Sequence, residues 1–313
     1  MEDPLRIIAR DAGVFLRREA RSAGYTDRML ASLRRQNIIH RVRHGAYCFA
    51  DTWNAATPEQ RHVILARAVV RMTPGPVALS HTTALILHGI HVWGADLTRV
   101  HVTRLATGAG RAEPDVTHHV GTCSENDTTE VSGLLVTVAD RAVVEAATIV
   151  GLESGIVSAD SAMHLKLCSD DELRSRARRM MHWSESRQVH AVLALMDGRS
   201  ESAGESRGRY LFKAQGLPMP DLQFEVYDAH GVLVAITDYV WHDHRAFGEF
   251  DGKVKYTKFL RSGEEPGDAV FREKRREDMV RGITSYSCGR MIWGDLSRPR
   301  QTAAYFRHIF GLD

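Results

Sequence analysis

The stretch that decides the fold is TDYVW at residues 237–241, followed after a polar turn by GEFDGK at residues 248–253. Apolar-alternating runs at 232–236 and 245–250 are typical of two β-strands joined as a hairpin. Each run leads into an acidic residue. The hairpin therefore predicts a sheet that carries carboxylates on neighbouring strands.

Asp238 and Glu249 are the two acids that such a hairpin places side by side. Hard oxygen donors that converge at a sheet suit Mg²⁺ or a similar divalent ion, which can stabilise a phosphate and activate water. The two-residue period of a strand also puts Asp251 and Lys253 on the face of Glu249. Charged residues usually lie on the surface, so the same string also fits solvated hairpin acids.

The remaining elements of the predicted C-terminal domain, residues 197–313, surround this hairpin. A short helix starts at Glu205 and stops at Gly216, whose lack of a side chain suits a helix end. Glu205 has two interpretations: it belongs to the acidic site, or it favours the positive N-terminal end of the helix. The other expected elements are strands at 222–227 and 231–238, a helix at 271–281, and a strand and turn at 290–296.

This order of elements resembles the PD-(D/E)xK nuclease superfamily, in particular its very-short-patch-repair-like endonucleases. The resemblance implies a restriction-endonuclease-like mixed sheet flanked by helices, with Asp238 and Glu249 holding Mg²⁺ or Mn²⁺ and Glu205 assisting. The family usually has a Lys at the third motif position. Here that position is Asp251, or the motif is lengthened to reach Lys253, so the general base is open between the two.

The N-terminal segment, residues 1–52, predicts a winged helix-turn-helix. Helical spacing covers 4–18, a short helix ends at Gly24, and a third helix runs from its N-cap Thr26 to Gln36. An alternating segment at 38–49 turns at His44-Gly45 and forms the wing. The third helix would enter the major groove of DNA. The expected DNA contacts are Arg28, Arg34 and Arg35 on the helix, and Arg41, Arg43 and His44 on the wing.

The charge distribution supports that expectation better than the net charge does. The 313 residues contain 41 Lys and Arg against 39 Asp and Glu, a net charge of only +2. Residues 1–50, however, hold ten Arg against five acids, which is the footprint of a phosphate-binding module. An Arg-rich composition that merely replaces Lys, or a winged helix used for protein contacts, remains an alternative.

Residues 10–170 resemble AbiEi-type abortive-infection antitoxins. The resemblance rests on RVRHGAY at 41–47, on the segment from Ala78 to Ile90, and on the strand-then-helix segment 136–147. It implies a middle α/β domain at 53–196 and a cognate toxin as a further partner. His81 and His88, two helical turns apart, are expected to be structural or partner-facing rather than metal ligands, and the same expectation covers His118 and His119.

Cysteine usage and hydropathy indicate the compartment. The four Cys are widely spaced and form no CxxC pair, which fits reduced thiols rather than zinc ligands or a disulfide framework. We see no signal peptide and no apolar run of the roughly 18 residues needed to span a bilayer. The expectation is a cytoplasmic protein without membrane contact.

Two functions from different classes follow. The first is an α/β (α+β) DNA-binding protein with a Mg²⁺-dependent endonuclease domain, in phage defence or a toxin–antitoxin context. The second is a non-catalytic antitoxin or transcriptional repressor that keeps the nuclease fold as a scaffold. A protein-interaction module is the third and weakest hypothesis.

Overall fold

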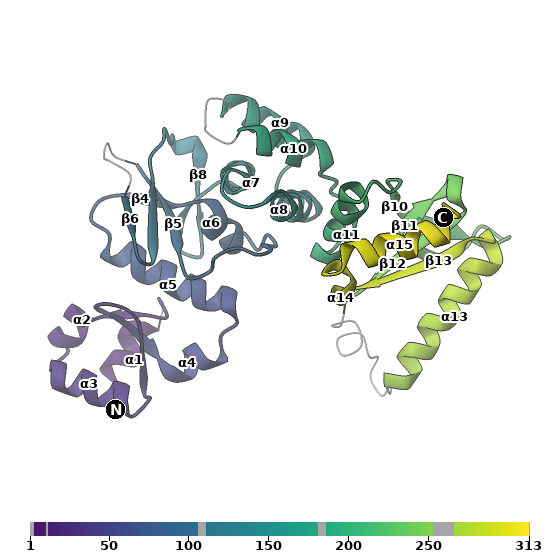
Figure 1. Ribbon diagram of the computed structural model, residues 1–313. Helices are drawn as coiled ribbons and strands as arrows, with labels where there is room; N and C mark the ends of the chain where they lie inside the picture. The colour runs from purple at the N-terminus through teal and green to yellow at the C-terminus, as the bar shows by residue number, and fades with distance from the viewer. Residues whose placement is uncertain (1–2, 11, 106–110, 181–185, 253–265, 313) are drawn as a thin grey trace. The chain divides into compact units, whose positions relative to one another are not determined.

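A computed structural model describes residues 3–10, 12–105, 111–180, 186–252 and 266–312. The chain forms two compact units, each described by itself below (Figure 1). The first unit contains residues 1–150 and 168–189, and the second contains 151–167 and 190–313. The predicted boundaries at 52 and 196 divide the chain differently, and the three-domain division stays a prediction.

The N-terminal segment of the first unit has the order helix, strand, helix, helix, hairpin. A three-stranded antiparallel sheet of order β1-β3-β2 packs against the helices around buried Phe15, Leu30 and Phe49. The elements are α1 (Pro4–Ala9), β1 (Phe15–Leu16), α2 (Arg17–Ser22), α3 (Asp27–Arg35), β2 (Ile39–Arg43), β3 (Ala46–Phe49) and α4 (Ala50–Ala55).

The expected helix at 4–18 is wrong in its length. It ends at Ala9, and Gly13, further along, adopts a left-handed φ of 67° that no helix contains. The chain then enters β1, where Phe15 pairs with Tyr47 of β3. Tertiary pairing with the hairpin therefore overrides the helical spacing of the sequence. The third helix and the hairpin at 38–49 are confirmed.

The rest of the first unit is a six-stranded mixed sheet with helices. The strand order is β6-β7-β5-β4-β9-β8, with parallel pairs β4–β9 and β5–β7. The strands are β4 (Val77–Leu79), β5 (Val100–Arg104), β6 (Arg111–Glu113), β7 (Val116–His119), β8 (Thr128–Val131) and β9 (Leu134–Thr137); the helices are α5 (Pro58–Met72), α6 (His81–Leu87), η1 (Glu125–Asp127), α7 (Ala139–Ala147) and α9 (Asp170–Arg179).

The second unit is built on a four-stranded mixed sheet of order β10-β11-β12-β13. The first three strands are antiparallel, and β13 is parallel to β12. Its elements are α8 (Leu152–His164), the end of α10 (Ser186–Leu195), α11 (Ala203–Ala214), β10 (Asp221–Tyr227), β11 (Leu233–Trp241), η2 (His242–His244), β12 (Ala246–Asp251), α13 (Pro266–Thr284), β13 (Ser287–Ile292), α14 (Trp293–Leu296) and α15 (Pro299–Phe310).

Two apolar clusters cover this sheet. The larger joins α11, α14 and α15 to the strands and includes Phe212, Tyr239 and Phe306, all fully buried. The smaller joins α13 to the strands through Val280 and Phe247. The sheet therefore lies between α13 and the helices α11, α14 and α15 (Figure 1).

Candidate nucleic-acid interface and carboxylate site

The helix α3 presents arginines to solvent from a well-capped start. The Thr26 hydroxyl accepts a hydrogen bond from the Met29 amide at 3.2 Å, the contact expected of an N-cap. Leu30 is buried, whereas Arg28, Arg34 and Arg35 are exposed. Leu30 thus anchors α3, and the three arginines carry positive charge into solvent.

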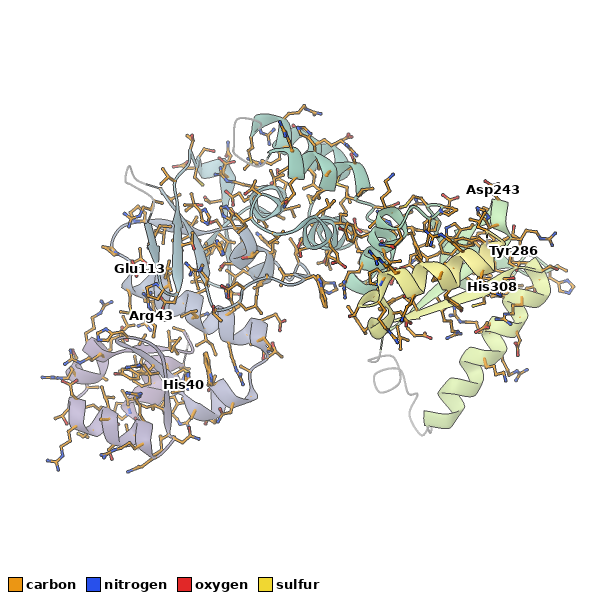
Figure 2. The ribbon with its side chains drawn as sticks, viewed as in Figure 1. His40, Arg43, Glu113, Asp243, Tyr286 and His308 are labelled. Atoms are coloured by element: carbon orange, nitrogen blue, oxygen red, sulfur yellow. The ribbon has the colours of Figure 1, made fainter. Side chains whose placement is uncertain are left out.

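The β2–β3 hairpin carries the three other residues that were expected to contact DNA, and their surroundings differ. Arg41 and His44 are exposed. Arg43 is largely buried instead: its guanidinium donates to the carboxylates of Glu113, at 3.2 Å, and Asp115, at 3.0 Å (Figure 2). In this structure Arg43 ties the β2–β3 hairpin to Glu113 of β6 and to Asp115 in the turn before β7, and its predicted contact with DNA stays a prediction.

The β11–β12 ladder ends at the acidic residues. Toward the acids, Tyr239 and Gly248 form the last pair between β11 and β12. Strand β12 stays paired with β13 as far as Asp251. Beyond this point the Phe250 amide donates to the Asp238 carboxylate at 2.6 Å. Asp238 lies within β11 rather than at its end, and Glu249 lies one position past the last β11–β12 pair.

Glu205 is a buried acid in the first turn of α11. Its carboxylate accepts hydrogen bonds from the Ser202 hydroxyl at 2.7 Å and from the Glu201 amide at 2.9 Å. Burial, followed by the negative charge of Asp238, raises its pKa to about 7. Gln223 of β10 donates to the same carboxylate at 3.3 Å. The structure thus brings Glu205 and Asp238 close enough for their charges to repel each other.

Glu249 and Asp251 each pair with an arginine. Glu249 is 4% exposed and accepts a hydrogen bond from Arg276 of α13. Asp251 accepts from Arg290 of β13 at 2.7 Å, and Arg290 also binds Glu277 at 2.7 Å. Positive charge already balances these two carboxylates.

Lys253, the alternative general base, lies outside the described residues. Sequence reasoning missed Gln223, Arg276 and Arg290 as members of this site. No local pattern in the sequence indicates that α13 brings Arg276 to Glu249. Arg290, by contrast, is placed by register, since it pairs with Glu249 across the parallel β12–β13 ladder.

Among the acids of this site, Glu205 and Asp238 fit a hard divalent cation. Glu205 and Asp238 supply oxygen ligands whose charges repel each other, and a cation between them would relieve that repulsion. Glu249 would join them on release of Arg276. Among the residues that the structure describes, however, the one group of three or more ligating side chains with ligand atoms within 4.8 Å of one another is a set of histidines in the first unit.

Taken together, these elements define a mixed α/β protein in which α3 exposes arginines near the N-terminus and the four-stranded sheet of the second unit carries a group of acids. Residues 2–50 match the family model described as "Transcriptional regulator, AbiEi antitoxin". The match covers α1 to α3 and the hairpin, so the AbiEi resemblance is confirmed for the N-terminal part. The nuclease resemblance stays a prediction.

Two curated relatives and one solved structure are similar to the chain. The relatives are the uncharacterized proteins MT2308 and Rv2248 from two strains of Mycobacterium tuberculosis, each 29% identical over 121 residues. That alignment covers 39% of this chain and 44% of each relative, so less than half of the relatives' length is matched. The crystal structure of the RV2827C protein from Mycobacterium tuberculosis aligns with 71% of this chain and 87% of its own, at 14% identity and a TM-score of 0.39.

The helices were compared with the length and hydropathy of a membrane span. Within the part of the chain that the structure describes, none combines the length and the apolar character that a bilayer span requires.

Proposed function

We propose that this protein is a DNA-binding regulator that reads DNA through α3. The observation that carries the proposal is the exposure of Arg28, Arg34 and Arg35 on a helix that is capped at Thr26 and anchored by Leu30. Arginines on such a helix can contact both phosphates and base edges. The family match over residues 2–50 supports the same function.

The order of elements supports a winged helix-turn-helix. Two helices precede α3 and a hairpin follows it, in the arrangement that places the third helix in the major groove. Exposed Arg41 and His44 on the hairpin would contact the backbone beside that groove.

A triple variant tests DNA binding. Arg28, Arg34 and Arg35 are replaced by Ala, and affinity for duplex DNA is measured by fluorescence anisotropy between 50 and 200 mM salt, roughly the range over which phosphate contacts dominate. We expect weaker binding and a shallower dependence on salt, with the logarithmic slope reduced by about one unit for each phosphate that the variant no longer neutralises. Arg300→Ala removes another exposed arginine, from α15, and should change neither the affinity nor its dependence on salt. Unchanged affinity in the triple variant would refute the proposal.

We further propose that the second unit hydrolyses phosphodiester bonds with Mg²⁺. The run α11, β10, β11, β12, α13, β13 and the divergence of β11 from β12 at the acids support it. So does the buried Glu205 next to Asp238, because two adjacent carboxylates repel each other and a divalent cation bound between them would be favoured.

In this proposal Asp238 and Glu205 hold the ion and Glu249 completes the set. The ion, when bound, stabilises the charge on the phosphate and lowers the pKa of an attacking water. The Phe250 amide fixes the orientation of the Asp238 carboxylate, and Gln223 fixes that of Glu205. Asp251, held by Arg290, and Lys253 remain the two candidates for positioning the water.

Cleavage of linear or nicked DNA tests this second proposal. Wild-type protein with Mg²⁺ should cut, and Asp238→Ala should abolish the cut while leaving DNA binding intact. Asp243→Asn alters an exposed acid in η2 of the same hairpin and should cut normally. Intact DNA at micromolar wild-type protein would defeat the enzymatic function and leave the regulator.

One observation favours a non-catalytic antitoxin or repressor as the second candidate. Glu249 and Asp251 are already neutralised by Arg276 and Arg290, so these acids can be stable without metal. This candidate predicts that the protein binds its own promoter without cutting it and binds a cognate toxin. Co-purification with the product of a neighbouring gene would support it.

A further inference from the structure

Three histidines from different elements meet inside the first unit. His81 opens α6, His101 lies in β5, and His119 ends β7; their ligand nitrogens all lie within 4.8 Å of one another. Sequence reasoning considered His81 together with His88 instead. His88 is separately bound, its Nε2 lying 2.8 Å from the Thr137 carbonyl.

Strand register explains how the group forms. The parallel ladder of β5 and β7 sets His101 opposite Thr117 and Thr103 opposite His119, so both histidines project from one face. Their rings share a hydrogen bond of 2.8 Å between His101 Nδ1 and His119 Nε2. The ring of His81 stacks on that of His119 with centroids 3.6 Å apart. No spacing rule for helices or loops could have indicated this group.

His81 is held in a costly conformation. Its φ of 52° lies in the left-handed region, which costs a non-glycine residue about 1–3 kcal/mol and concentrates at functional sites. The surrounding groups fix it there: His81 Nδ1 lies 3.0 Å from the Ser80 hydroxyl, and its backbone amide donates to Glu145 at 3.3 Å. Glu145 is itself fully buried and bound by Arg141 at 2.7 Å.

The same surroundings keep the three rings neutral. Burial, then the neighbouring histidines, lowers the pKa of His101 to about 3, and burial with His118 nearby lowers the pKa of His119 to about 4. The pKa of His81 falls well below its ordinary value, again mainly through burial. Neutral imidazoles keep the lone pairs that metal ligation needs.

We propose that His81, His101 and His119 form a binding site for a divalent transition-metal ion, with Zn²⁺ as the foremost candidate. Three histidines with an open fourth position are an established donor set for zinc, and imidazole also suits Ni²⁺ and Cu²⁺. Mg²⁺ is disfavoured because the site offers nitrogen rather than oxygen ligands.

The geometry needs only a small adjustment. Zinc–nitrogen bonds of 2.0–2.1 Å in a tetrahedron separate the nitrogens by about 3.3 Å. The 2.8 Å contact between His101 and His119 opens slightly as the ion replaces the shared proton. His81 offers Nε2, because Nδ1 faces Ser80, and the broad torsion of an imidazole about its χ2 lets the stacked ring turn toward the ion. Glu145 acts as a positioning residue behind His81.

Metal analysis of the full-length protein, prepared without a histidine tag, tests this site. We expect about one equivalent of zinc per chain after dialysis, and d–d absorption of a four-coordinate ion when Co²⁺ is added to chelated protein. His119→Gln should lower the Zn²⁺ affinity at least about 100-fold and remove the Co²⁺ spectrum. His118→Gln changes the neighbouring residue of the same strand and should retain both.

Thermal denaturation separates loss of the site from loss of the fold. Zn²⁺ should raise the melting temperature of wild type and of His118→Gln, and should leave that of a folded His119→Gln unchanged. Failure of wild-type protein to bind Zn²⁺ or Co²⁺ would overturn the proposal. So would an undiminished affinity in His119→Gln, or in a His101→Gln variant prepared in case the first does not fold.

Discussion

At the scale of single residues, the acids of the candidate carboxylate site fall into two kinds. Glu249 and Asp251 are matched by arginines, whereas Glu205 faces another carboxylate. Burying a carboxylate beside a like charge costs stability, so a residue in the second situation is maintained for a reason other than folding. The pair Glu205 and Asp238 is therefore the one on which the proposed hydrolytic site depends most.

We expect Glu205→Gln to stabilise the protein at alkaline pH. The folded-state pKa of about 7 lies above the ordinary 4.5, so the folded state binds the proton more tightly and stability falls as pH rises between these values. Removing the charge should therefore raise the free energy of unfolding by about 1–3 kcal/mol at pH 8 and by little at pH 4. Urea denaturation at the two pH values measures this, and equal effects at both would contradict it.

The pKa of Asp127 is shifted in the opposite direction, downward. Despite the opposing effect of burial, hydrogen bonds from Ser124 together with Arg176 and Arg141 lower its pKa from 3.8 to about 2. A lowered pKa stabilises the folded state above pH 4, and that stability is lost as pH falls toward 2. Asp127→Asn should cost about 1–2 kcal/mol at pH 7, once screening by solvent is allowed for.

The measurement for Asp127→Asn is the pH dependence of unfolding. The difference in unfolding free energy between variant and wild type should shrink as the pH falls from 3.8, the ordinary pKa, to about 2, the pKa in the folded state. Asp170→Asn, which breaks an exposed pair with Arg174, serves as the control and should cost well under 1 kcal/mol. A destabilisation that persists unchanged at pH 2 would point to packing rather than charge.

At the scale of elements, α3 depends on its cap. Thr26→Ala removes the hydroxyl that accepts from the Met29 amide, a change that typically costs about 1 kcal/mol. We expect faster hydrogen exchange in the first turn of α3 and weaker DNA binding, because the arginines lose a rigid support. Thr26→Ser keeps the acceptor and should restore both. Full binding by the alanine variant would show that the cap does not serve recognition.

Elements also show what the sequence could and could not predict. Strands β10 to β12 and helix α3 were predictable because alternation, turns and caps are local signals. The end of the first helix at Ala9 was not predictable, because Phe15 forms a strand only through its pairing with Tyr47. Within the acidic site, Glu205, Asp238 and Glu249 were nominated from the sequence, but their partners Gln223 and Arg276 depend on which elements pack together. Contacts between distant elements are set by tertiary packing, which no local pattern encodes.

At the scale of the whole molecule, two compact units carry the two proposed activities. The arginines of α3 belong to the first unit and the acids near β11 to the second. If binding and hydrolysis are separate functions, substitutions should affect separate kinetic quantities. A contact that is equally strong in the bound substrate and in the transition state changes the DNA concentration at which the reaction saturates. A contact made only in the transition state changes the maximal rate.

We therefore expect a clean division in a DNA cleavage assay of the full chain. Arg34→Ala should raise the DNA concentration for half-maximal cleavage several-fold with little change in the maximal rate, because it removes an interaction present throughout the reaction. Glu249→Gln should lower the maximal rate by at least about 10-fold with little change in half-saturation. The double variant should show both effects multiplied, as expected for sites that act independently. A fall in the maximal rate caused by Arg34→Ala would mean instead that DNA held by the first unit takes part in assembling the carboxylate site, so that recognition and hydrolysis form one coupled step.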